Sequence, residues 1–283
     1  MAYFSGVQLR RILFAAVTTT GLMGQGMAFA GSPSEPPQTT WDDLKGNVFA
    51  DRTIADAGSL MTMDAPKRAE DAAIVPIDLH FKPDGQANAI KSVTLIIDEN
   101  PSPVAAVFKF GPGAAISHLS TRIRVNAYSY VRAVAETQDG KLHMTQAFVK
   151  ASGGCSAPAV GDQDEAMASL GKMKLKVFSV KEQKAAPMTK AAEVQLMIRH
   201  PNNSGLQMDQ ITRYYVPARF VHEMTISQGD RLILSMEGGI SISEDPNFRF
   251  AFDALSDKEL DVAISDTDGK KFTGKWPLAA ASN

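Results

Sequence analysis

The residue best suited to covalent chemistry is Cys155, the single cysteine in a chain of 283 residues. It follows Gly153 and Gly154, which carry no side-chain bulk and permit almost any backbone angle. A thiol on such a tether can swing out and enter a narrow cleft of another protein. Lys150 nearby would modestly favour the thiolate, which is the nucleophilic form. One cysteine also excludes an intramolecular disulfide and any zinc or iron–sulfur site that needs several thiolates.

Other motifs that would support catalysis are missing from the sequence. It has no phosphate-binding loop, no dinucleotide-binding glycine pattern and no nucleophile elbow. The five histidines are scattered without metal-ligand spacing, and each is interpreted as a surface or cap residue. They are His80, His118, His143, His200 and His222. Residues 266–269 open like a calcium loop but lack the later ligands, so they predict a hairpin turn. We therefore expect no catalytic residue, no metal and no cofactor.

The charge balance restricts the class of partner. The chain has 29 basic and 31 acidic side chains, a formal charge of −2, which argues against a protein that coats nucleic acid or an anionic membrane. Its 44% hydrophobic residues exclude a wholly disordered or collagen-like chain. No stretch after the first thirty residues reaches the ~18 apolar residues of a membrane span.

Residues 1–30 have the pattern of an export signal. Arg10 and Arg11 precede an apolar run over residues 12–27, and Ala28-Phe29-Ala30 is a small-x-small cleavage site. Cleavage after Ala30 would deliver the protein to the periplasm or outside the cell, by either the Sec or the twin-arginine route. The alternative is that the segment is retained as a membrane anchor. We expect thiols there to become oxidised, so a lone cysteine either pairs between chains or is kept free for chemistry.

After a loose leader over residues 31–40, hydrophobic alternation of period two dominates the sequence. A short helix is predicted over residues 41–49, with Thr40 as its N-cap. Strands at roughly ten-residue spacing with Gly and Asp turns then indicate antiparallel β-sandwiches. The alternating positions include Val93, Leu95, Ile97, Leu119, Ile123, Val131, Ala133, Leu175, Val194, Leu196, Leu234, Phe248, Phe250, Val262 and Ile264.

A small, acidic stretch interrupts this alternation at residues 156–171. It has room for one helical turn but is best interpreted as a linker. The predicted organisation is therefore all-β: a first domain over 31–155, the linker, and a second domain over 172–279.

Several local motifs resemble a known family in their order along the chain. The first half resembles the Y subunit, and the second half the Z subunit, of the periplasmic SoxYZ sulfur-carrier complex. Motifs of the first half are Asp98-Glu99-Asn100-Pro101, Ser120-Thr121-Arg122-Ile123-Arg124, the segment 131–136 with Asp139-Gly140, and Gly153-Gly154-Cys155. Motifs of the second half are Ile198-Arg199-His200-Pro201 with Gly205, Asp245-Pro246-Asn247-Phe248-Arg249-Phe250, and Asp266-Thr267-Asp268-Gly269. The whole resembles the fused SoxYZ-like carrier associated with quinoprotein dehydrogenases.

This resemblance implies two immunoglobulin-like sandwiches that pair with each other within the chain. It implies that Cys155 is the covalent attachment point for a sulfur intermediate, and that Gly153 and Gly154 form the flexible arm. The protein would then be a carrier on which partner enzymes act. The implied partners are periplasmic sulfur-oxidation enzymes, c-type cytochromes or a quinoprotein dehydrogenase.

The sequence departs from the family pattern directly after the cysteine. Ser156-Ala157 replaces the second glycine pair, and the chain continues into the second domain. A loop held at two ends reaches less deeply into a partner than a free tail. This favours a cargo and partner outside the standard thiosulfate pathway, beside an alcohol-oxidising, quinone-dependent dehydrogenase.

Three hypotheses follow for the function. The first is a periplasmic carrier that holds a sulfur or other electrophilic fragment on Cys155. The second is a non-catalytic assembly module for a dehydrogenase or cytochrome, with Cys155 incidental, as a small residue in a glycine-rich turn whose thiol is idle or buried. The third is a dimer linked by a Cys155 disulfide. We favour the first, because an exposed free thiol is a liability in an exported protein.

Overall fold

The computed structural model describes residues 38–158, 163–182, 189–255 and 259–278. The predicted export signal over residues 1–30 lies outside the described residues. Among those described, no helix combines the length and apolar character needed to cross a membrane.

The first half of the chain forms one helix and eight strands. They are α1 (Thr39–Phe49), β1 (Ile54–Asp56), β2 (Met61–Asp64), β3 (Val75–Phe81), β4 (Ile90–Ile97), β5 (Val104–Phe110), β6 (His118–Ile123), β7 (Ser129–Thr137) and β8 (Leu142–Val149). The described part of the second half continues with α2 (Gln163–Ala168), β9 (Met173–Glu182), β10 (Thr189–Ile198), β11 (Val221–Gln228), β12 (Arg231–Gly238), β13 (Asn247–Leu255), β14 (Leu260–Asp266) and β15 (Lys271–Trp276).

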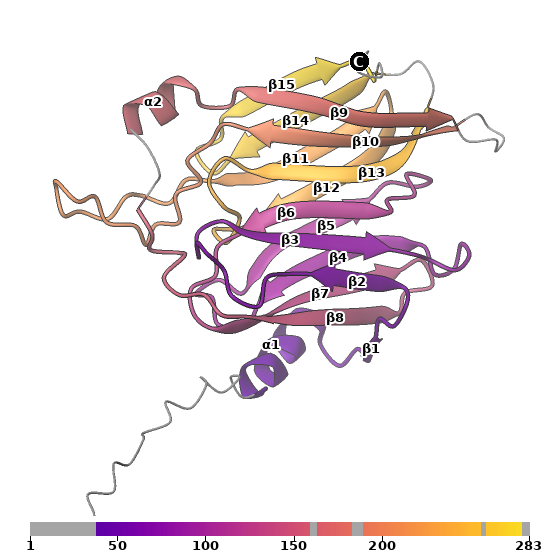
Figure 1. Cartoon of the computed structure of the whole chain (residues 1–283), viewed down its shortest axis with the longest axis horizontal. Helices are drawn as coiled ribbons and strands as arrows, with labels where there is room; N and C mark the ends of the chain where they lie inside the picture. The colour runs from indigo at the N-terminus through magenta and orange to yellow at the C-terminus, as the bar shows by residue number, and fades with distance from the viewer. Residues whose placement is uncertain (1–37, 159–162, 183–188, 256–258, 279–283) are drawn as a thin grey trace, which may run out of the picture. The chain divides into compact units, whose positions relative to one another are not determined.

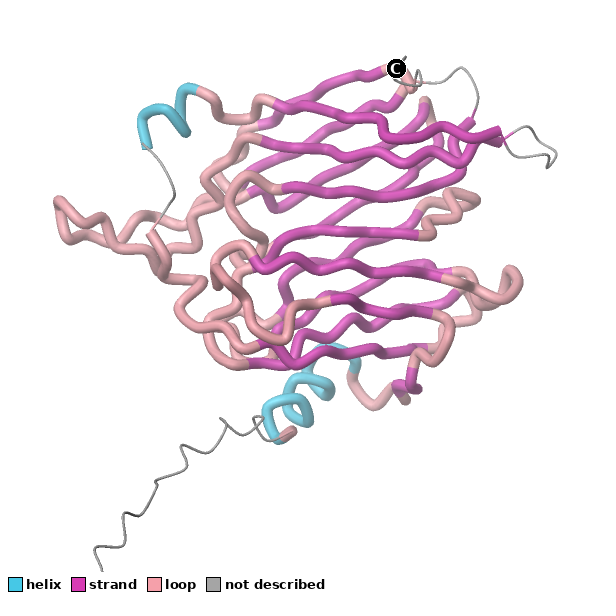
Figure 2. The backbone as a smooth tube through the Cα atoms, in the orientation of Figure 1, coloured by secondary structure: helices cyan, strands magenta, loops and turns pink. Residues whose placement is uncertain are grey.

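These strands form two sheets, and each sheet contains strands from both halves (Figure 1). The nine-stranded sheet has the order β1-β8-β7-β4-β5-β12-β11-β14-β15, and the six-stranded sheet has the order β2-β3-β6-β13-β10-β9. The halves join where β5 pairs with β12 and where β6 pairs with β13, both antiparallel. Figure 2 shows these strands running side by side through the join. Edge strands expose unpaired backbone N–H and C=O groups, and this pairing satisfies them.

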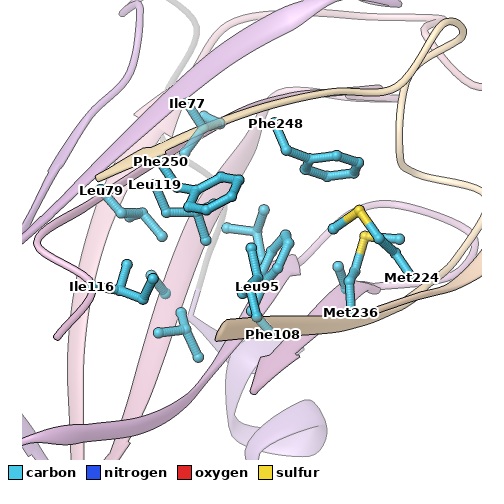
Figure 3. Close-up of a cluster of buried hydrophobic side chains, with 14 of the residues drawn as sticks. Ile77, Leu79, Leu95, Phe108, Ile116, Leu119, Met224, Met236, Phe248 and Phe250 are labelled. Carbon is cyan, nitrogen blue, oxygen red and sulfur yellow. The ribbon is translucent and has the colours of Figure 1, made fainter. Parts of the chain in front are cut away.

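A single hydrophobic cluster occupies the space between the sheets and continues from one half to the other. Figure 3 shows Leu79 and Leu119 of the first half beside Phe250 of the second. The rings of Phe108 on β5 and Phe248 on β13 meet edge to face, with centroids 6.1 Å apart. Both rings are fully buried, and burying an aromatic side chain stabilises a fold by about 1.5–3 kcal/mol.

The predicted all-β sandwich fold is confirmed, and along β13 the alternation marks the buried face correctly. Along β13, Phe248, Phe250 and Phe252 are buried while the residues between them are partly exposed. The sequence did not reveal that the two sandwiches share both sheets. Period-two alternation identifies the buried face of a strand but carries no information on which edge strand it pairs with.

The helix α1 packs on the outer side of the nine-stranded sheet. Its Trp41 and Phe49 form a second cluster with Ile96, Val134 and Leu142. The helix was predicted, but the Thr40 cap is wrong: the helix begins at Thr39, its N-cap is Gln38, and no side chain caps it.

The predicted turns are confirmed at two hairpins. Between β7 and β8 the N–H of Gly140 donates to the carbonyl of Thr137 (2.9 Å), and between β14 and β15 the N–H of Gly269 donates to that of Asp266 (2.9 Å). Both glycines have positive φ, which is why Asp-Gly suits these turns. The stretch between the halves contains α2, one short helix within the predicted linker.

Candidate functional site

Cys155 lies six residues beyond the end of β8, where the chain leaves the first half. The sequence predicts a thiol on a mobile tether, but in this structure Cys155 has none of its surface exposed. Its thiol is free of any disulfide. The residue is therefore docked against the protein, and any chemistry at its sulfur requires the loop to move.

The two glycines before it hold the loop in this docked position. The N–H of Gly153 donates to the carbonyl of Asn126 (2.8 Å), and the N–H of Gly154 donates to that of Val125 (3.0 Å). Gly153 has a φ of +81°, a conformation that other residues adopt only with strain. A Cβ on Gly154 would lie 2.0 Å from the carbonyl oxygen of Ala72, closer than any real contact. Gly154 therefore permits a close approach of two backbones, a role that differs from simple flexibility.

Ser156 closes the turn around the cysteine. Its N–H donates to the carbonyl of Gly153 (3.1 Å), and its hydroxyl donates to the same oxygen (3.2 Å). The residue that departs from the family pattern thus contributes two hydrogen bonds to the docked turn. A second glycine here would keep only the backbone bond.

The positive charge beside the thiol comes from Arg124, and the expected contribution of Lys150 is not observed. Arg124 is fully buried, and its guanidinium donates to the carbonyls of Gly154 (3.2 Å) and Asn202 (3.4 Å). Its Nε has no hydrogen-bond partner among the described residues. Burial lowers the pKa of Arg124, while the charges of Glu244, Cys155 and Asp71 counteract this effect.

The thiol itself is held in its protonated form. Burial raises the pKa of Cys155 from its ordinary 9.0 to about 11, against an opposing effect of Arg124. At neutral pH almost none of the docked sulfur is thiolate, so the docked state is poorly nucleophilic. The structure thus shows a protected thiol.

The second half covers the cysteine from the other side. The hydroxyl of Ser204 donates to the carbonyl oxygen of Cys155. Ser204 lies at the base of the 203–219 hairpin, a two-stranded extension between β10 and β11. Bridges from Asn203 to Arg219 and from Met208 to Tyr215 hold its two sides together. Cys155 therefore lies at a contact between the two halves.

A buried polar network continues behind this contact. The N–H of Asn202 donates to Nδ1 of His200 (3.0 Å), and Nε2 of His200 lies 3.5 Å from Oδ2 of Asp266. Arg219 donates to the same carboxylate oxygen (2.8 and 3.0 Å). Burial lowers the pKa of His200, opposed by its contact with Asp266. The interpretation of His200 as a surface or cap residue is wrong, because it belongs to the buried base of the hairpin.

Two other histidines form a stacked pair. The rings of His80 and His118 lie 4.9 Å apart, and Nε2 of His118 is 2.9 Å from Asp78. In the part of the chain that the structure describes, no group of three or more His, Cys, Asp or Glu residues is arranged to hold a metal ion.

Sequence reasoning missed Arg124 and Ser204, the two side chains that hold the cysteine loop. Arg124 occupies a polar position in the alternating segment 118–125, and this pattern predicts that its side chain points toward solvent. The strand β6 ends at Ile123, however, and beyond it both Arg124 and Val125 are fully buried. Ser204 carried no signal in the sequence, because its role depends on a contact between residues 49 positions apart.

Comparison with known families gives two matches within the chain. Residues 45–155 match the family of "Sulfur oxidation protein SoxY", and residues 180–277 match that of "Sulphur oxidation protein SoxZ". A search of the curated proteins returned no match. The first match ends on Cys155 itself, at the contact with the hairpin of the second half.

Proposed function

We propose that this fused SoxYZ-like protein, whose halves belong to the SoxY and SoxZ families, carries an intermediate covalently on Cys155 and presents it to partner enzymes. The family is one of sulfur-oxidation carriers, whose subunits are acted on by other proteins and are not catalysts themselves. The observation that carries the proposal is the position of the only cysteine, which is the last residue of the SoxY match and contacts the SoxZ half.

The docked state supports a cycle of protection and release. While the loop is docked, a pKa of about 11 keeps the sulfur protonated and its burial shields it from oxidants. Undocking would return the pKa toward 9.0, which raises the thiolate fraction at neutral pH by about 100-fold. Gly153 and Gly154 would then serve as the arm that brings the sulfur into a partner.

Loading of the Cys155 sulfur can proceed by two routes. In the first, the thiolate attacks an electrophilic sulfur, a new S–S bond forms, and the leaving group takes the electron pair. In the second, the thiolate couples with a sulfur anion, which forms the same bond and releases two electrons. A c-type cytochrome or other partner oxidoreductase would accept these electrons. Neither route requires a catalytic residue in this chain.

The setting we propose is the periplasm, after removal of residues 1–30, beside a quinoprotein dehydrogenase. The domain boundaries 31–155, 156–171 and 172–279 belong to the same proposal. Partners that load and unload Cys155 would be separate periplasmic oxidoreductases.

The test is the intact mass of the protein isolated from the native periplasm. We expect an added mass that disappears on reduction and is absent from Cys155→Ala. A strain carrying Cys155→Ala is expected to lose growth on the substrate that feeds the carrier. Unmodified thiol under every condition, together with normal growth of that strain, would reject the carrier function.

The burial of Cys155 also favours a second function. An assembly module for a dehydrogenase or cytochrome needs no accessible sulfur, so a docked thiol is compatible with it. This function predicts that partner pull-down survives Cys155→Ser and is lost on removal of residues 172–279. A disulfide-linked dimer is tested by non-reducing gel electrophoresis.

A further inference from the structure

The 203–219 hairpin exposes large apolar side chains at its tip. Ile211 is 93% exposed, Tyr214 78% and Tyr215 64%, all within five consecutive residues. In Figure 1 the orange segment that contains this hairpin extends away from both sheets. Aromatic and apolar residues gathered at such a site are typical of the energetic centre of a protein interface.

The tip is held in one conformation by its own hydrogen bonds. Oδ1 of Asp209 accepts from the N–H groups of Ile211 (3.0 Å) and Thr212 (2.6 Å), and also from the Thr212 hydroxyl (2.8 Å). The N–H of Asp209 in turn donates to the carbonyl of Tyr214 (2.9 Å). These bonds to the carboxylate lower the pKa of Asp209. A preorganised tip loses little conformational entropy when it binds.

The base of the hairpin is joined to the loop that bears the thiol. Ser204 donates to the carbonyl of Cys155, and the carbonyl of Asn202 accepts from Arg124, which also holds Gly154. A protein that binds the tip therefore contacts the same hairpin whose base packs over Cys155. The two sides of the hairpin pack closely, since a Cβ on Gly205 would lie 3.0 Å from that of Ala218. A contact at the tip is therefore transmitted to the base of the hairpin.

We infer that the 203–219 hairpin is the surface by which the enzyme that loads Cys155 recognises this carrier. The inference rests on the proposed carrier function and names the surface that serves it. The enzyme fits this surface with an apolar or aromatic recess for Ile211 and the two tyrosines. Carboxylates at the rim of the recess would meet Arg213, an exposed cation at the tip. Binding there places the enzyme over the hairpin base, where displacement of Ser204 removes one of the hydrogen bonds that hold the cysteine loop.

The experiment compares the loaded fraction of Cys155 in protein purified from native cells. The tip variant is Ile211→Ser, and a stronger version adds Tyr214→Ser and Tyr215→Ser. The matched control is Val48→Ser, which removes an exposed apolar side chain from α1, 36% exposed in the first half. Intact mass gives the loaded fraction, and the alkylation rate of each isolated protein checks that the docked loop is unchanged.

We expect the triple tip variant to lower the loaded fraction by about tenfold or more, as loss of interface hot-spot residues does. The Val48→Ser control should load as the wild type does, and the alkylation rates of all isolated proteins should agree. Normal loading of the triple variant would overturn the hairpin inference while leaving the carrier function intact. Absence of any adduct on the wild type would instead reject the carrier function, and the inference with it.

Discussion

Two loops meet at Cys155, and they differ in which side chains they bury and which they expose. The loop from the first half buries its thiol completely, whereas the hairpin from the second half leaves Ile211 93% exposed. Both are rigidly hydrogen-bonded, so the difference does not arise from disorder. One loop keeps its thiol out of solvent, while the other presents apolar side chains to solvent. Under the proposed carrier function, reaction and recognition lie in different halves of one chain.

The largest effect is expected from Gly154→Ala, which should abolish the difference in exposure between the loops. A Cβ there would overlap the Ala72 carbonyl, so the loop must undock. With the thiol pKa back near its ordinary value, the alkylation rate at neutral pH should rise about 100-fold. Stopped-flow or mass-spectrometric alkylation measures this rate.

Gly153→Ala is the matched control for that change. A Cβ at Gly153 meets nothing within 4 Å and only strains a positive φ, which costs about 1 kcal/mol. It should accelerate alkylation only about fivefold. Equal effects of the two substitutions would contradict the docked geometry, and a thermal melt of each protein shows whether the core remains folded.

The next effect concerns pH. Because burial raises the pKa of the docked thiol, the contribution of the protonated thiol to docking is fully present below pH 9 and is lost as pH rises through about 11. The alkylation rate of the wild type should therefore rise with pH toward a midpoint near 11. The same profile for Gly154→Ala should have its midpoint near 9.0. A wild-type midpoint at the ordinary value would mean that the sulfur is already in water.

A smaller effect is expected from Ser204→Ala, which removes the hydrogen bond between the two loops. One such bond contributes about 1 kcal/mol, so the alkylation rate should rise about fivefold. The control is Ser117→Ala, an exposed serine just before β6. No acceleration by Ser204→Ala would show that the hairpin base does not hold the cysteine loop.

The smallest effect is expected at the hairpin tip. Ile211 is nearly fully exposed, so Ile211→Ser should change the free energy of unfolding by less than about 0.5 kcal/mol. Denaturant melts measure this change. A large loss of stability would show that Ile211 packs against the rest of the protein and is not available to bind a partner.

Much of the fold could be predicted from the sequence, because burial of one sheet face forces period-two alternation. Phe248, Phe250 and Phe252 predict β13 in this way. The strand β5 buries Ala105 and Ala106 in succession, which interrupts the alternation at its start, and it was not recognised. The sharing of both sheets by the two halves rests on pairings of β5 with β12 and β6 with β13, which no local pattern encodes.

The candidate site could be predicted only in part. The sequence identifies Cys155 as the candidate attachment point, because it carries the only thiol in the chain and follows a pair of glycines. Its burial was only one of the alternatives left open by the sequence, because it depends on Ala72, Arg124 and Ser204, which approach from distant parts of the chain. Glycines that look flexible in a sequence can equally mark a close backbone contact, as Gly154 does here.

The most direct test of covalent attachment at Cys155 is peptide mapping of the protein isolated during active substrate oxidation, with free thiols alkylated at once. If Cys155 is the attachment point, the peptide that contains it will carry a reducible added mass. This peptide will become fully alkylated only after the mass has been removed by a reductant. Recovery of that peptide as free, alkylatable thiol at every stage of turnover would contradict the central claim that Cys155 is the attachment point.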